Sequence, residues 1–166
     1  MSENKEKKTD IQNSKSGMGR HLNRSVAMQY IYMRDMNPEG SFENTLNEFI
    51  LKNEEELGLK SGYFSFAREL VVGAFTNAES VDNTIEENAK NWSIDRIAKV
   101  ELAILRLAVF ELLYRDDIPP VVTINEAINL TKEFSSEESK RFINGLLDNL
   151  SLKLNRPLRS VNKKDI

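Results

Sequence analysis

The segment that decides the fold is residues 97–114, which reads IAKVELAILRLAVFELLY. Fourteen of its 18 residues are apolar. The four polar residues are Lys99, Glu101, Arg106 and Glu111. A helix that is apolar on almost every side must be surrounded by other helices. We therefore expect a central helix over about residues 95–115. Because Arg106 and Glu111 should lie near the core, and a buried charge is costly unless it is paired, each should make a structural ion pair or contact a helix terminus.

Apolar residues at helical spacing predict six further helices around this central one. Their expected ranges are about 20–36, 42–56, 61–77, 78–91, 124–134 and 136–154. Gly73 lies inside the third range, where it lowers helix propensity, and the usual structural reason is close approach of another helix. No segment shows the alternation typical of strands. The expected fold class is therefore all-α, with about seven helices.

Two helix starts carry the spacing of a capping box, in which Ser or Thr is followed three residues later by Glu. Thr123 and Glu126 have this spacing, as do Ser135 and Glu138. The proline-containing stretch 118–122 should be an extended connection before the first of them. These patterns predict that the last two helices begin just after Thr123 and Ser135.

The two ends of the chain are polar and show no helical pattern of apolar residues. We expect a flexible polar tail over residues 1–17, a single domain over 18–154 and a basic tail over 155–166. Neither a signal peptide nor a run of about 18 apolar residues is visible. The expected location is therefore the cytoplasm.

Composition argues against a catalytic or metal-dependent protein. The chain of 166 residues has no cysteine and one histidine, His21. This excludes a disulfide scaffold, a Cys nucleophile and a thiolate metal site, and it makes a His-based relay very unlikely. Glycine-rich phosphate loops are also absent. We expect no enzyme activity, no cofactor and no metal.

Charge is distributed unevenly along the chain, whose net charge is −3. Residues 1–36 carry +3, residues 37–90 carry −7 and residues 91–166 carry +1. An autonomous nucleic-acid-binding domain is usually clearly basic, so any RNA contact should be local and sensitive to salt. The acidic middle segment is either a solvated surface or a surface that attracts a basic partner.

The first group of residues that could bind RNA lies at the start of the first helix. Arg20 and Arg24 are four residues apart and share a helix face, with His21 beside them. Helix N-termini favour anions, so this group could hold the phosphate backbone of RNA. The alternative is an ordinary solvated basic face.

The second group is the corner before the last helix. It runs from Phe134 to Phe142 and contains Lys140 and Arg141. Aromatic rings beside basic side chains can stack unpaired bases and hold phosphates. The alternative is that both phenylalanines belong to the core and the charges are solvated.

Several segments, in order and at matching spacing, resemble one known family. They are VAMQYIY at 26–32, Val81-Asp82 with Ile85, LRLAVFEL at 105–112, Ile118-Pro119, VTINEAINLTKEF at 122–134 and KRFINGLLD at 140–148. Together they resemble the NusB family of bacterial transcription antitermination factors. The resemblance covers about residues 20–150.

The resemblance implies a helical fold of two small subdomains, over about residues 18–78 and 79–154. It also implies that the protein binds without catalysing a reaction. Members of this family bind the boxA element of nascent ribosomal RNA together with the ribosomal protein NusE. They then help elongating RNA polymerase to resist termination. The RNA-binding residues that it implies here are Arg20, His21, Arg24, Tyr32, Phe134, Glu138, Lys140, Arg141 and Phe142.

Two other functions stay open at this point. NusB-like domains also occur fused to ribosomal RNA methyltransferases, so the chain could be a detached targeting module of such an enzyme. It could also be a helical protein-interaction scaffold with no RNA contact. Some relatives self-associate, which leaves a homodimer open as well.

Overall fold

The computed structural model describes residues 3–90 and 92–157, with side chains from Gly17 onward. Seven α-helices and one 3₁₀ helix account for most of this part of the chain, and it contains no strand. The helices are α1 (Glu3–Met36), α2 (Phe42–Glu56), α3 (Ser65–Thr76), α4 (Ala78–Asn88), η1 (Ile94–Arg96), α5 (Lys99–Tyr114), α6 (Pro120–Phe134) and α7 (Glu137–Lys153). The predicted all-α class is confirmed.

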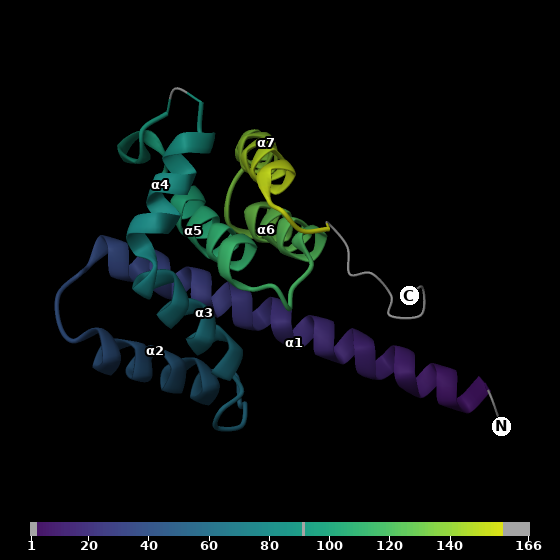
Figure 1. Cartoon of the computed structure of the whole chain (residues 1–166). Coiled ribbons are helices and arrows are strands. Elements are labelled where there is room, and N and C mark those ends of the chain that lie inside the picture. The colour runs from purple at the N-terminus through teal and green to yellow at the C-terminus, as the bar shows by residue number, and fades with distance from the viewer. Residues whose placement is uncertain (1–2, 91, 158–166) are drawn as a thin grey trace.

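Helix α5 lies in the middle of the molecule, as its sequence predicts. Helices α1, α3, α4, α6 and α7 all pack against it, and α2 covers α1 (Figure 1). Ten of its 16 residues are buried. Both charges expected near the core have ionic partners, since Glu111 pairs with Arg24 and Arg106 pairs with Asp82. One continuous apolar core surrounds the helix.

Helix α1 is longer than the sequence predicts. It begins at Glu3 rather than near residue 20, so it includes most of the expected tail, and its N-terminal part extends away from the other helices (Figure 1). No proline precedes Pro38, and the Lys, Glu and Gln residues of this stretch are good helix formers.

The expected basic tail at the other end lies outside the described residues from 158 onward. In the described part of this tail, residues 155–157, Arg156 donates hydrogen bonds to the backbone carbonyls of Arg115 and Ile118, at 3.0 and 3.2 Å. The chain just after α7 is therefore fixed to the end of α5.

Helix α6 starts one turn earlier than the capping-box pattern predicts. Pro119 occupies the N-cap and Pro120 the first helical position, where proline has no amide hydrogen bond to lose. Thr123 therefore lies inside the helix, and its buried hydroxyl donates to Glu111. The prediction of an extended connection over 118–122 is therefore wrong for residues 120–122, which belong to α6.

Helix α7 is also capped by a different residue from the predicted one. The Ser136 hydroxyl accepts a hydrogen bond from the backbone N–H of Ser139 at 3.3 Å. The neighbouring Ser135 hydroxyl donates instead to Glu101 of α5, at 2.9 Å. Glu138 is exposed in the first turn, where its charge still suits the positive end of the helix.

The division into subdomains over about 18–78 and 79–154 stays a prediction. Helix α1 packs against α3 and also against α5, so the two groups of helices share one core. None of the helices in the described part of the chain could span a lipid bilayer.

Gly73 of α3 lies against the ring of Phe110 of α5, as the sequence predicts for a glycine inside a helix. A methyl group built on Gly73 would come within 2.1 Å of Phe110 Cζ and within 2.6 Å of Cε2. By contrast, Gly145 of α7 has no atom within 4 Å of the same position. The glycine at 73 therefore allows α3 and α5 to approach closely.

We expect Gly73→Ala to lower the free energy of unfolding by about 1–3 kcal/mol, because the methyl group must displace a packed ring. Gly145→Ala is the matched control and should raise it by up to about 1 kcal/mol, through helix propensity alone. Urea-induced unfolding followed by circular dichroism measures both. Equal effects of the two substitutions would contradict the close approach of α3 and α5.

Candidate nucleic-acid interface

His21 brings the two predicted groups of residues together. Its Nδ1 lies 2.7 Å from a carboxylate oxygen of Glu126, and its Nε2 lies 2.5 Å from one of Glu133. Both acids belong to α6, and Glu133 directly precedes Phe134. The start of the packed part of α1 therefore lies beside the corner between α6 and α7.

The two carboxylates also determine the charge of His21. Partial burial lowers the pKa of His21, but the hydrogen bonds and negative charges of Glu126 and Glu133 raise it by more. The net pKa is above the ordinary value of 6.5, and the protonated ring can donate a hydrogen bond to each acid. His21 thus joins α1 to α6 through contacts with two acids.

Arg24, which the sequence analysis predicted to bind RNA, is placed inside the protein. It is only 2% exposed. Its Nε donates to both carboxylate oxygens of Glu111, at 3.2 and 3.0 Å, and its Nη2 donates to one of them at 2.8 Å. The i, i+4 spacing does place Arg20 and Arg24 on one face, but that face turns into the core at Arg24. A phosphate cannot reach a guanidinium held in this way.

Arg20 and Tyr32 differ from Arg24 in being accessible. Arg20 is exposed, and its guanidinium lies 4.5 Å from the centre of the Phe66 ring. Tyr32 is 36% exposed and lies about three turns further along α1. Of the predicted α1 residues, these two offer side chains to solvent, while His21 is half-buried.

The α6–α7 corner presents both aromatic and charged side chains. Phe134, the last residue of α6, is 39% exposed, and Arg141 is exposed on α7. Lys140 is half-buried and pairs with Glu137 at 3.7 Å. Phe142 is partly buried against the core. The corner therefore has one accessible ring, one fixed ring and one exposed arginine.

A hollow of about 310 Å³ lies beside this corner and includes a residue that the sequence analysis missed. It is lined by Trp92, Arg96, Ile97, Ala98, Glu101, Glu138, Ser139 and Phe142. Trp92 is 52% exposed, and its ring centre lies 6.2 Å from that of Phe142. Its position between two helices in a polar stretch was a usable signal, because a tryptophan there has no core face to join.

Glu101 forms an acidic wall of this hollow. Burial raises the pKa of Glu101, but hydrogen bonds from the hydroxyls of Ser139 and Ser135 and from its own backbone lower it by more, so the net pKa is below the ordinary value. The carboxylate therefore stays ionised near neutral pH. Glu138 is a second acid in the same wall.

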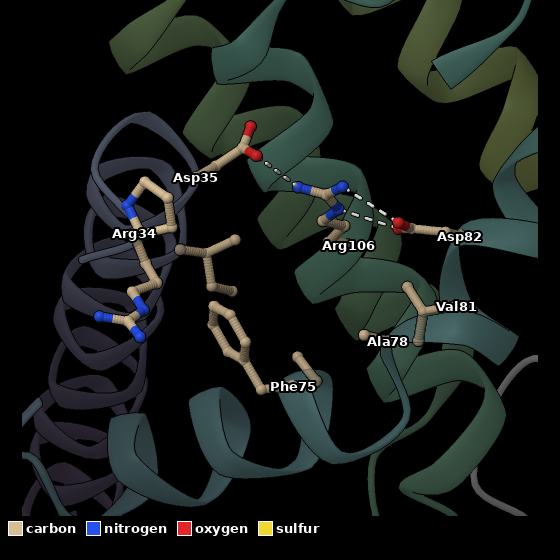
Figure 2. Close-up of a pocket in the computed structure, with 10 residues that line it drawn as sticks. Arg34, Asp35, Phe75, Ala78, Val81, Asp82 and Arg106 are labelled. Atoms are coloured by element: carbon tan, nitrogen blue, oxygen red, sulfur yellow. Dashed lines mark hydrogen bonds and ion pairs between the residues drawn. The ribbon is translucent and has the colours of Figure 1, made fainter. Parts of the chain in front are cut away.

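Another hollow, of about 340 Å³, opens between α1, α3, α4 and α5, and it includes none of the predicted site residues. Figure 2 shows its apolar wall at Phe75, Ala78 and Val81, with Arg106 between Asp35 and Asp82 at the rim. Arg106 donates to both oxygens of Asp82, at 2.9 and 3.0 Å. Lys99 of α5 lies 3.1 Å from Asp35 and supplies the second positive charge, so these ion pairs tie α1, α4 and α5 together.

We expect His21→Asn to remove a link between α1 and α6 whose strength depends on pH. Because folding raises the pKa of His21, its contribution to the free energy of unfolding is complete below about pH 6.5 and is lost as pH rises through the folded-state pKa. Urea unfolding between pH 6 and 9 should show the difference between variant and wild type shrinking with pH. NMR titration of this single histidine is the control, and a pKa of 6.5 or below would contradict the link.

We expect Arg24→Ala to lower the free energy of unfolding by about 3–5 kcal/mol, because it leaves the buried Glu111 carboxylate without its partner. The double variant Arg24→Met with Glu111→Leu removes both charges and should be clearly more stable than Arg24→Ala. Chemical denaturation measures this. If Arg24→Ala weakened RNA binding without lowering stability, Arg24 would instead be assigned to the RNA-binding surface.

Comparison with known sequences identifies close relatives over most of the chain. A profile described as the NusB family matches residues 21–152. The transcription antitermination protein NusB of Geotalea daltonii is 47% identical over 138 residues, which are 81% of this chain and 95% of that protein. The NusB of Acetivibrio thermocellus is 43% identical over 133 residues, covering 78% of this chain and 86% of that protein.

Solved structures agree with this assignment. T. maritima NusB superimposes with a TM-score of 0.71 at 29% identity, over 81% of this chain and 91% of that one. The NusB chain of a complex of NusB and NusE with dsRNA gives a TM-score of 0.71 at 28% identity, over 82% of this chain and 98% of that one. Profile, relatives and folds thus point the same way, and the chain belongs to the NusB family.

Proposed function

We infer that this chain is a transcription antitermination factor that binds RNA together with a NusE partner. The support is its membership of the NusB family, its similarity to proteins named for antitermination, and its likeness to a NusB chain solved with NusE and dsRNA. The RNA that we propose is the boxA element of nascent ribosomal RNA, and the elongating RNA polymerase is an indirect partner. In bacteria this process takes place in the cytoplasm.

The observation that carries this proposal is the placement of His21 next to Glu133. It brings the turn of α1 that carries Arg20 beside the end of α6, where the ring of Phe134 is accessible. Basic side chains that attract phosphates, beside rings on which bases can stack, are the features of a surface that binds unpaired RNA. Neither feature supplies a nucleophile or a base for catalysis, so we propose a binding role.

The described cations of α1 also explain why a partner is needed. Arg24 is paired with Glu111, and His21 is paired with two acids of α6. Arg20 is left as the accessible cation at the start of this surface. Few phosphate contacts give weak attraction. A partner that binds the same RNA adds contacts without a second loss of translational freedom, so the complex binds much more tightly than either protein alone.

We propose an interface that revises the set expected from the sequence. Its members are Arg20, Tyr32, Trp92, Phe134, Glu138, Lys140, Arg141 and Phe142. Arg24 is removed because it is buried, and Trp92 is added because it stands against Phe142. His21 positions the surface and does not need to touch RNA.

The methyltransferase-linked alternative fits less well. The chain covers 95% of the length of the Geotalea daltonii protein, so it matches that NusB as a whole protein. The likeness to a NusB chain solved with NusE and dsRNA favours RNA contact over a scaffold without it. We therefore place antitermination first.

We expect boxA RNA to bind at least tenfold more tightly to a mixture with NusE than to this protein alone, because the partner completes the surface. RNA binding should quench the fluorescence of Trp92, the only tryptophan of this chain. The Trp92→Phe variant serves as the control, because any fluorescence change that remains in it comes from the partner. Gel shift gives the affinities. An affinity unchanged by NusE would refute the composite surface.

The salt dependence separates an RNA contact from a general effect of charge. Arg141→Ala should weaken binding and reduce the slope of log K against log salt by about one, the value for one lost phosphate contact. The matched control is Arg68→Ala, on α3, where the arginine pairs with Asn47 and Glu43 of α2. That variant should bind RNA like the wild type.

A further inference from the structure

Three guanidinium groups gather around the ring of Phe66, which the sequence did not single out. The central carbon of Arg20 lies 4.5 Å from the ring centre, that of Arg24 5.3 Å and that of Arg115 5.5 Å. The first two come from α1, and the third follows the end of α5. A cation over an aromatic face is attracted by the quadrupole of the ring.

Two of these arginines are already held by acids. Arg24 makes its three hydrogen bonds to Glu111. Arg115 donates to both carboxylate oxygens of Asp117, each at 2.8 Å, and to Glu69 at 3.0 Å. The hydrogen bond from Arg115 is the main reason that the pKa of Asp117 is lowered to about 2. Neither arginine has its charge free for a ligand.

Arg20 is different because its guanidinium lies over the Phe66 ring without an acidic partner in the described part of the chain. Among the described side chains, no carboxylate lies within ion-pair distance of its guanidinium, and its side chain is exposed. Asp117, whose pKa it lowers slightly, is itself engaged by Arg115. Stacking uses the flat face of the guanidinium and leaves the N–H groups at its edge available.

Phe66 is a fixed platform for this arginine. It is partly buried against the core, in the first turn of α3. The neighbouring backbone N–H of Ala67 donates to Asn23 Oδ1 at 3.0 Å, and the Asn23 amide donates to the carbonyls of Gly19 and Tyr63. Asn23 lies one turn after Arg20 on α1. These bonds set the position of the ring relative to the turn of α1 that carries Arg20.

We propose that Phe66 is a positioning residue for RNA binding, which holds the Arg20 guanidinium over its ring so that its N–H edge can meet a phosphate. This inference rests on the proposed function. A free arginine loses much rotational freedom when it binds a ligand, and a stacked one has already lost part of it. The ring therefore raises affinity through Arg20 without touching the RNA.

A double-mutant cycle tests this coupling on the complex with NusE and boxA RNA. Phe66→Leu keeps an apolar side chain but removes the ring, and we expect it to weaken binding about three- to tenfold. In an Arg20→Ala background the same substitution should have no further effect. Phe66→Tyr keeps the ring and should bind like the wild type. Phe75→Leu is the matched control, because Phe75 is on the same helix but packs at an angle against the rings of Tyr30 and Phe42.

The salt slope distinguishes positioning from contact. Arg20→Ala should reduce it by about one, whereas Phe66→Leu should leave it unchanged, since the phosphate contact is still made. In the free protein, the Arg20 Nε–H resonance should shift when Phe66→Leu removes the ring current.

Two results would overturn the inference alone: equal weakening by Phe66→Leu with and without Arg20, or full affinity in Phe66→Leu. Failure of the wild-type complex to bind any RNA would overturn the proposed function and this inference with it. Thermal unfolding of each variant shows whether a lost affinity reflects a lost fold.

Discussion

The buried ion pair between Arg24 and Glu111 fixes the register of α1 against α5. Glu111 lies on the central helix, where an ionised carboxylate is tolerated only with charged and hydrogen-bonded partners. Arg24 supplies three hydrogen bonds from α1, and the Thr123 hydroxyl supplies one from α6. Three helices are thus held at one point. Once Arg24 points inward, the preceding residues are set as well: His21 meets α6 and Arg20 meets Phe66 of α3.

The same constraint determines how much positive charge reaches the surface. The sequence has three candidate cations at the start of the packed part of α1, but two of them stabilise the fold. Arg24 is neutralised inside the core, and His21 is shared by Glu126 and Glu133. Charge used to join helices cannot also attract phosphates. A protein of this kind is expected to bind RNA weakly by itself, which agrees with a function exercised in a complex.

The sequence could predict features that depend on neighbours along the chain. The apolar run of α5, the need of Arg106 and Glu111 for partners and the close approach at Gly73 all follow from local pattern and are confirmed. It could not predict burial of Arg24, because its partner Glu111 is 87 residues away. Helical spacing gives the face that two residues share, but not where that face enters the core.

The hollow beside Trp92 shows the same limit for the functional surface. Its lining comes from separate elements: Trp92 from the loop before η1, Glu101 from α5 and Phe142 from α7. Only the packing of these elements brings the three side chains together. In the proposed interface, the acids Glu101 and Glu138 would repel phosphates but can accept hydrogen bonds from the amino groups of bases. Such a wall disfavours unspecific backbone binding while it permits a correctly placed base, so it favours selectivity at the expense of affinity. In the proposed complex, the partner would supply the missing attraction for phosphates, and the rings and acids of this chain would discriminate among base sequences.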